Sequence, residues 1–209
     1  MRSRVVLLGP PGAGKGTQAK RISRSTGLVH LSSGDILRDE VSRATELGRT
    51  ASSFMERGEL VPDGLIVDMI RGRIEAAESG FLLDGFPRTV EQAEALEAIT
   101  PLDVVINIEL AREEVVRRLT ARRVCEGCGK IYNLLYDPPE DELTCAACSG
   151  VLVQRNDDRR DVIENRYDVY ERSTAPLIEY YRDRGLLRDV EGMRPSDAIS
   201  SEILAILPR

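Results

Sequence analysis

Short runs of apolar residues recur along the chain, and segments with helical periodicity lie between them. The first run, residues 5–8, precedes a glycine-rich loop and a helical stretch that reaches Arg24. Similar strand-like runs cover residues 29–31, 81–84, 104–110 and 186–190. A short apolar run bounded by turn residues is typical of a strand buried on both faces. The alternation of strands and helices predicts an α/β fold with right-handed crossovers and a parallel sheet.

Glycine, proline and capping residues predict where several helices begin and end. A helix is expected to start near Ser33, and a helical region from about residue 47 to residue 77 is punctuated by Gly48, Gly58 and Pro62. Residues 161–184 are also expected to be helical, with Pro176 starting a new segment or imposing a kink. Finally, Ser196 should open a terminal helix that ends near Leu207.

Residues 124–153 interrupt the alternation of predicted strands and helices and contain all four cysteines of the chain. The cysteines form two C-x-x-C pairs separated by sixteen residues, Cys125 with Cys128 and Cys145 with Cys148. This spacing is typical of a four-cysteine zinc site, and a closed shell of four thiolates indicates a structural metal. Iron could occupy the same ligands, and disulfides are the alternative in an oxidising compartment.

Composition narrows the class of protein. The chain has 209 residues, of which 42% are hydrophobic and 31% charged, which suits one α/β domain with a modest insertion. Its net charge of −6 argues against a broad electrostatic surface for nucleic acid, so an anionic ligand needs a local cluster of cations. The apolar run near the start is too short for a signal peptide, and no run is long enough to span a membrane. We therefore expect a cytoplasmic protein, whose reduced thiols are free to bind a metal.

The loop after the first strand has the pattern of a phosphate-binding loop. Residues 9–15 read G-x-x-x-x-G-K between a predicted strand and a predicted helix, the context that this motif requires. Its glycines let backbone N–H groups converge on phosphate oxygens, and Lys15 adds a full charge. Gly16 follows the lysine, so the hydroxyl comes one residue later, at Thr17. The alternative is a glycine-rich turn with a surface lysine, which the strand–loop–helix context disfavours.

Several further motifs occur in a fixed order along the chain. They are residues 9–17, 32–38, 58–61 and 84–89 with Gln92, then 118–123 and 155–158, then Tyr180-Tyr181 followed by Gly185 and Val190. Together they resemble the adenylate kinase family nearly end to end. The resemblance implies a three-layer P-loop NTPase fold with a central five-stranded parallel sheet, a mobile helical AMP-binding flap and a small zinc-binding lid. The implied domains are a core of residues 1–31, 62–123 and 162–209, a flap of residues 32–61, and a lid of residues 124–161.

The resemblance also implies roles for individual residues. The implied catalytic residues are Lys15, Arg88, Arg122, Arg155, Arg166 and Asp84. Those implied to bind ATP are Gly12, Ala13, Gly14, Lys15, Gly16, Thr17, Arg118, Arg122 and Arg194. Those implied to bind AMP are Ser33, Arg38, Glu59, Val61, Gly85, Arg88, Gln92, Arg155 and Arg166. Ser33 stands where the family often has threonine, and Arg194 where it usually has lysine. Asp157 and Asp158 resemble lid carboxylates that fix arginines when the lid closes.

Local sequence suggests how some of these residues lie. Arg118 and Arg122 are four residues apart, which predicts that they share one helical face. Asp84 ends an apolar strand, where phosphate-loop enzymes place a carboxylate that orients Mg²⁺; the alternative role is a helix N-cap. The chain has one histidine, His30, for which we expect a structural role. Any single arginine could instead lie on a solvated helix face.

The expected reaction is reversible transfer of a phosphoryl group, ATP + AMP = 2 ADP, with Mg²⁺ bound to ATP and a structural Zn²⁺ in the lid. Its partners would be ATP, AMP and ADP, with no nucleic acid and no membrane, and the chain would be a monomer that closes strongly around its substrates. One alternative is a kinase for another nucleoside monophosphate, against which Gln92 and the long lid argue. A second is a zinc-ribbon nucleic-acid-binding protein with an ATPase switch. The acidic balance and the 4% of aromatic residues argue against it.

Overall fold

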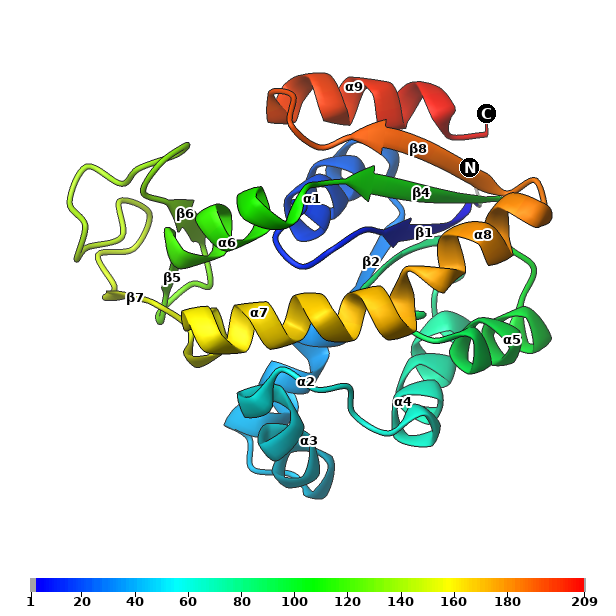
Figure 1. Cartoon of the computed structure of the whole chain (residues 1–209), viewed down its shortest axis with the longest axis horizontal. Helices are drawn as coiled ribbons and strands as arrows, with labels where there is room; N and C mark the ends of the chain where they lie inside the picture. The colour runs from blue at the N-terminus through cyan, green and yellow to red at the C-terminus, as the bar shows by residue number, and fades with distance from the viewer. Residues whose placement is uncertain (1–2, 209) are drawn as a thin grey trace.

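The computed structural model describes residues 3–208 and is built around a parallel sheet of five strands (Figure 1). The strand order is β2-β3-β1-β4-β8. In chain order these strands are β1 (Arg4–Leu8), β2 (Val29–Ser32), β3 (Phe81–Asp84), β4 (Val104–Glu109) and β8 (Leu187–Glu191). At the centre of the sheet, Val6 pairs with Leu83 on one side and with Val105 on the other. The predicted five-stranded parallel sheet is confirmed.

Helices cover both faces of the sheet because successive side chains of a strand point to opposite faces. Val5 and Leu7 of β1 belong to one buried cluster, and Val6 and Leu8 belong to the other. The first cluster includes residues of α1 (Lys15–Thr26), α6 (Arg112–Thr120), α7 (Arg160–Val169) and α9 (Ser196–Ile206). The second includes residues of α4 (Asp63–Glu75), α5 (Val90–Ile99) and α8 (Pro176–Asp183). The fold therefore has the three expected layers.

Two further helices, α2 (Ser33–Ser42) and α3 (Glu46–Arg57), extend from one side of the molecule (Figure 1). The predicted breaks at Gly58 and Pro62 separate α3 from α4, and Gly58 caps α3 in the left-handed conformation with φ 73°. Gly48 does not interrupt the helix as expected. It lies within α3, where a Cβ atom would come within 2.1 Å of the carbonyl oxygen of Glu40. The glycine therefore allows α2 and α3 to pack closely.

The cysteine-containing segment forms a second, antiparallel sheet in the order β6-β5-β7, on the left of Figure 1. Its strands are β5 (Arg122–Cys125), β6 (Ile131–Asn133) and β7 (Leu152–Val153). The prediction that Arg118 and Arg122 share a helical face is wrong. Helix α6 ends at Thr120, and Arg122 pairs with Asn133 as the first residue of β5. Backbone pairing with β6 places Arg122 in a strand, although its spacing from Arg118 suggested a helix.

The segment after the second sheet returns to the core as two helices. Helix α7 runs into a π-helical turn, Tyr170–Thr174, and α8 begins at Pro176 as predicted. Proline suits the first turn of a helix because its missing N–H group has no intrahelical partner there. Among the described residues, no helix is both long and apolar enough to cross a membrane.

Candidate active site

The loop between β1 and α1 has the geometry of a phosphate cradle. Gly14 takes φ 92° at the N-terminus of α1, and Gly9 takes φ 132°, where a Cβ atom would lie 2.4 Å from the carbonyl oxygen of Ile108. Only glycine fits these two positions. Lys15 Nζ donates hydrogen bonds to the carbonyl oxygens of Gly9 at 2.7 Å and Pro10 at 2.8 Å. The lysine therefore curls over its own loop, with the third N–H of its ammonium group left for another acceptor.

The carboxylate of Asp84 lies directly beside this loop. A Cβ atom on Gly16 would be 3.2 Å from Asp84 Oδ2, so the small residue after Lys15 leaves space for the carboxylate. The alternative role of Asp84 as a helix N-cap is wrong, because the cap of α5 is Thr89. His30 Nε2 lies 3.7 Å from Asp84 Oδ2, and both side chains are largely buried. The histidine thus packs behind the carboxylate, on the neighbouring strand.

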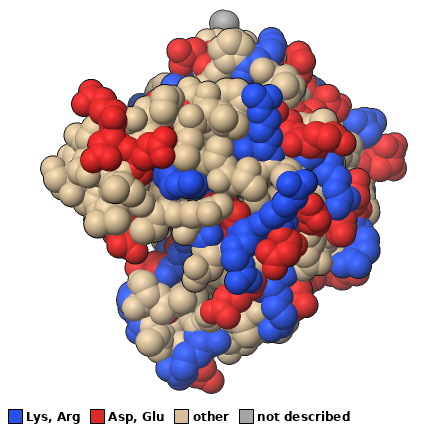
Figure 2. All heavy atoms as spheres, turned by 60° about the vertical axis from the view of Figure 1, so that its left-hand side comes forward, with Lys and Arg blue, Asp and Glu red and all other residues tan. Residues whose placement is uncertain are grey.

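One cavity of about 930 Å³ brings together every residue predicted for the nucleotide sites. Segments far apart in the sequence line it: the phosphate loop, α2, the end of β3, the start of β5 and the part of α7 that carries Arg166. Its Lys and Arg residues are Lys15, Lys20, Arg21, Arg38, Arg88, Arg118, Arg122, Arg155, Arg166 and Arg194. Its acidic residues are Asp35, Glu59, Asp84, Asp137 and Asp157. The cavity is therefore locally cationic, although the chain is acidic overall and its basic and acidic side chains are interspersed in Figure 2.

Two aspartates that precede α7 hold arginines from separate elements. Asp158 is fully buried and accepts two hydrogen bonds from Arg122, from Nε at 2.7 Å and from Nη2 at 2.5 Å. Arg166 Nη1 lies 2.9 Å from Asp157 Oδ2 and 3.5 Å from Asp158 Oδ1. Planar guanidinium groups held by carboxylates in this way have fixed orientations. The pair of aspartates therefore links β5 to α7 at the wall of the cavity.

Burial of so many cations in one place shifts their pKa values. Desolvation lowers the pKa of Lys15 to about 8, although Asp84 opposes the shift. Desolvation and the nearby charge of Arg166 lower the pKa of Arg88 to about 10. Desolvation, with the nearby charge of Arg122, likewise lowers the pKa of Arg155 to about 10. Each shift means that the folded protein disfavours the positive charge, so an anion in the cavity would be stabilising.

A second part of the cavity wall, away from the phosphate loop, lies between α2 and the loop after β3. Ser33 Oγ donates to the carbonyl oxygen of Gly85 at 2.6 Å, and Arg88 Nε donates to the same oxygen at 2.7 Å. Val61 is buried, whereas Glu59 is exposed and pairs with Arg57. These contacts place an arginine, a hydroxyl group and an apolar wall together.

Sequence reasoning missed a group of contacts where the second sheet meets the cavity. The buried carboxylate of Glu114 accepts from Arg118 Nε at 2.9 Å and from the Tyr136 hydroxyl at 2.6 Å. Arg118 Nη2 also donates to the carbonyl oxygen of Gly192 at 2.9 Å. Arg194, a few residues further on, forms an ion pair with Glu202. No motif marks Glu114 or Tyr136, because their meeting depends on the tertiary fold.

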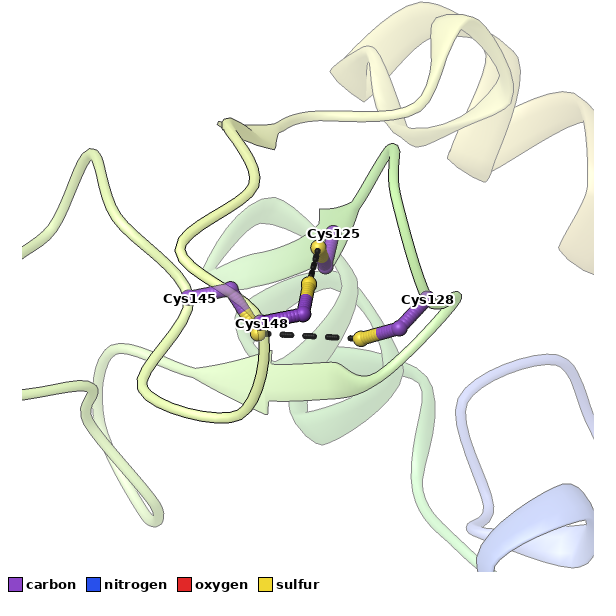
Figure 3. Close-up of side chains that lie close together, drawn as sticks. All are labelled: Cys125, Cys128, Cys145 and Cys148. Atoms are coloured by element: carbon purple, nitrogen blue, oxygen red, sulfur yellow. Dashed lines mark hydrogen bonds between the residues drawn. The ribbon is translucent and has the colours of Figure 1, made fainter.

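The four cysteines converge beside the second sheet, as their spacing predicted (Figure 3). Their Sγ atoms all lie within 4.8 Å of one another; Cys125 Sγ is 3.4 Å from Cys148 Sγ, and Cys128 Sγ is 3.7 Å from Cys145 Sγ. All four are free thiols, so the disulfide alternative is wrong. A tetrahedral zinc site with Zn–S bonds of about 2.3 Å has sulfurs about 3.8 Å apart. The cluster therefore fits a tetrahedral metal ion.

A parallel sheet with a phosphate loop after its central strand and an arginine-lined cavity defines a P-loop phosphotransferase. A sequence profile of the adenylate kinase family matches residues 7–186. An adenylate kinase of Archaeoglobus fulgidus is 47% identical, covering 98% of each chain. Those of Methanocella arvoryzae and Carboxydothermus hydrogenoformans are each 48% identical, covering 97% of both chains in the first case, and 96% of this chain and 97% of the relative in the second. The chain belongs to the adenylate kinase family.

Membership of this family establishes the reaction. The protein is a phosphotransferase that catalyses ATP + AMP = 2 ADP, with Mg²⁺ accompanying ATP. The family assignment favours AMP over the other nucleoside monophosphates as acceptor.

Proposed function

We propose that the two nucleotides lie end to end in the cavity and that its cations stabilise the phosphoryl group in flight. The catalytic set would be Lys15, Arg88, Arg122, Arg155, Arg166 and Asp84. The observation that carries this proposal is their convergence on a single cavity from separate elements of the chain. The set contains no general base, and none is needed, because the attacking phosphate oxygen of AMP is already ionised near neutral pH.

Positioning and charge neutralisation account for catalysis in this arrangement. Phosphoryl transfer passes through a loose transition state whose charge is spread over the equatorial oxygens. Arginines suit this task because their planar forks bind phosphate in bidentate fashion and remain charged at neutral pH. Asp84 and Thr17, which both line the cavity, would help to hold the Mg²⁺ that accompanies ATP, and this ion would supply positive charge to the phosphates.

The two ends of the cavity would serve different substrates. At the donor end, residues 12–17 would cradle the phosphates of ATP, and Arg118, Arg122 and Arg194 would lie along the rest of the nucleotide. The acceptor end would bind AMP through Ser33, Arg38, Glu59, Val61, Gly85, Arg88, Gln92, Arg155 and Arg166. Arg155, within residues 124–161, and Arg38 on α2 both line the cavity. We therefore infer that segments 32–61 and 124–161 move as flap and lid against the remaining core, and that their closure excludes water.

We also infer that the lid binds zinc as a structural ion. Four thiolates leave no open coordination position, and the lid has only a small apolar core of Cys125, Tyr132, Cys145 and Leu152. Metal binding would therefore supply much of the folding free energy of this segment. Free thiols of this kind fit a reducing cytoplasm. We further propose that the chain acts as a monomer, without nucleic acid or membrane partners.

A coupled assay with single substitutions tests the residue roles. Lys15→Ala and Arg88→Ala should each lower turnover by about 10²-fold or more, because each removes a charge from the phosphates, while thermal unfolding changes little. Arg49→Ala, which removes an exposed arginine from α3, serves as the control. Near-normal turnover in either site variant would remove that residue from the mechanism. Weak binding of a mimic that joins two adenosines through five phosphates would contradict the end-to-end arrangement.

A further inference from the structure

The side-chain amide of Gln92 is held at both of its ends. Gln92 is 2% exposed and lines the cavity. Its Oε1 atom accepts a hydrogen bond from the backbone N–H of Arg88 at 2.8 Å, and its Nε2 atom donates to Asp63 Oδ1 at 2.8 Å. A backbone N–H can only donate and an ionised carboxylate can only accept. The amide therefore has a single favourable orientation. Rotating it by half a turn would place its NH₂ group against the Arg88 N–H and its oxygen against the Asp63 carboxylate.

Asp63 is itself fixed in place. It is the first residue of α4, and its Oδ2 atom accepts from the hydroxyl of Thr89 at 2.7 Å. Thr89 in turn caps α5 by accepting from the backbone N–H of Gln92 at 3.1 Å. Both oxygens of Asp63 are thus committed, and Asp63 is not among the residues that line the cavity. Asp63 therefore acts on a ligand only indirectly, and its direct contact with a residue that lines the cavity is the one with the Gln92 amide.

The fixed amide offers a defined pair of groups to a base. One hydrogen remains on Nε2 and one lone pair on Oε1, which makes one donor and one acceptor in a set order. Adenine presents a matching pair, because its 6-amino group donates and its ring N1 accepts. A 6-oxopurine presents the reverse pair, because its O6 atom accepts and its N1–H donates. Such a base would need the amide in the orientation that Asp63 and Arg88 oppose.

We propose that Asp63 is a positioning residue that sets selectivity for a 6-aminopurine monophosphate over a 6-oxopurine monophosphate. It does so by holding the Gln92 amide in the orientation complementary to adenine. The inference rests on the proposed function, which places Gln92 at the base of AMP. It extends that function by naming a residue outside the cavity that controls what the cavity accepts.

The test compares AMP with inosine monophosphate, which differs from AMP in the 6-substituent and the N1 proton. In Asp63→Asn the new carboxamide can accept from Nε2 or donate to a rotated Oε1. Of the two hydrogen bonds that fix the amide orientation, only the one from the Arg88 N–H then still does so. The ratio of kcat/KM for AMP to that for inosine monophosphate should fall about tenfold, the effect of one hydrogen bond to a charged group. The KM for ATP should stay unchanged. Asp68→Asn makes the same charge change at an exposed position of α4 and should leave the ratio as it was.

Further variants distinguish an error in the proposed place of Gln92 from an error in the proposed role of Asp63. Gln92→Leu should lower kcat/KM for AMP; if it does not, the proposed place of Gln92 is wrong. If Gln92→Leu impairs AMP use but Asp63→Asn leaves the ratio unchanged, or lowers both substrates equally, the positioning role alone is overturned. Thermal unfolding reports whether each variant is folded. Should Asp63→Asn unfold at the assay temperature, Asp63→Ala, which also frees Nε2, must give the same loss of selectivity for the proposal to stand.

Discussion

Asp158 joins the second sheet to the core through a buried ion pair, and its replacement by asparagine gives a sharp test of the fold. The aspartate is fully buried and accepts both hydrogen bonds of the Arg122 fork, with Arg166 close to the same oxygen. Asp158→Asn keeps the shape of the side chain and removes its charge. Two arginines then face a neutral group, one N–H of which points at a guanidinium donor.

The magnitude follows from the burial of the pair. Removing one partner of a buried ion pair destabilises a protein by about 3–5 kcal/mol. The Arg122 side chain retains 16% exposure, so some of its charge stays solvated and the lower end, about 3 kcal/mol, applies. An unfolding entropy of about 2.1 cal/mol/K per residue gives about 0.4 kcal/mol/K for a chain of this length. The melting temperature should therefore fall by about 7 °C.

Calorimetry or circular dichroism measures this shift, and Asp161→Asn is the matched control. Asp161 lies three residues further on, its side chain is 76% exposed, and its one ion-pair partner among residues 3–208 is Arg159 at 3.8 Å. Loss of such an exposed pair should move the melting temperature by about 1 °C. If Asp158→Asn melts within 2 °C of the parent protein (about 1 kcal/mol), the buried pair does not stabilise the fold and the reasoning is refuted.

Three further predictions follow from the site. Cys128→Ser should lower the metal content and the melting temperature, by about 5 °C or more, with Ala146→Ser as the control; equal melting curves would argue against a structural metal. The value of kcat/KM for ATP should fall above pH 8, because deprotonation of Lys15 in the free enzyme removes the charge that binds phosphate. In Lys15→Arg the charge persists, so a fall at the same pH would assign it to another group. Tyr136→Phe should raise the KM for ATP about threefold to tenfold by releasing Glu114, with the KM for AMP unchanged; equal changes in both would contradict this local role.

Local patterns sufficed to predict the sheet, the phosphate loop and the cysteine cluster. Strands buried on both faces are continuous apolar runs, so β1, β3 and β4 were visible in the sequence. The two C-x-x-C pairs form tight turns whose thiols meet once β5 and its neighbours pair. The phosphate loop depends on glycines at fixed spacing, which a sequence displays directly.

Contacts set by the tertiary fold could not be predicted in this way. Arg122 has helical spacing from Arg118, but strand pairing with β6 decides its conformation. The approach of α2 requires Gly48, although an isolated glycine in a helical pattern reads as a break. Asp63 and Glu114 look like ordinary acidic residues near the starts of helices, where such residues favour the helix dipole. Their roles appear only when their partners are known.

The electrostatics of the cavity indicate why substrate should drive closure. Desolvation lowers the pKa values of Lys15, Arg88 and Arg155, so the folded protein holds these charges at a cost in free energy. Phosphate groups offset this cost most fully where all the cations face them. Because Arg38 and Arg155 lie on the proposed flap and lid, a bound nucleotide would favour the arrangement that brings these segments together. Binding and closure would then be one linked equilibrium, whose driving force is the cost of holding desolvated, mutually repelling cations in the free site.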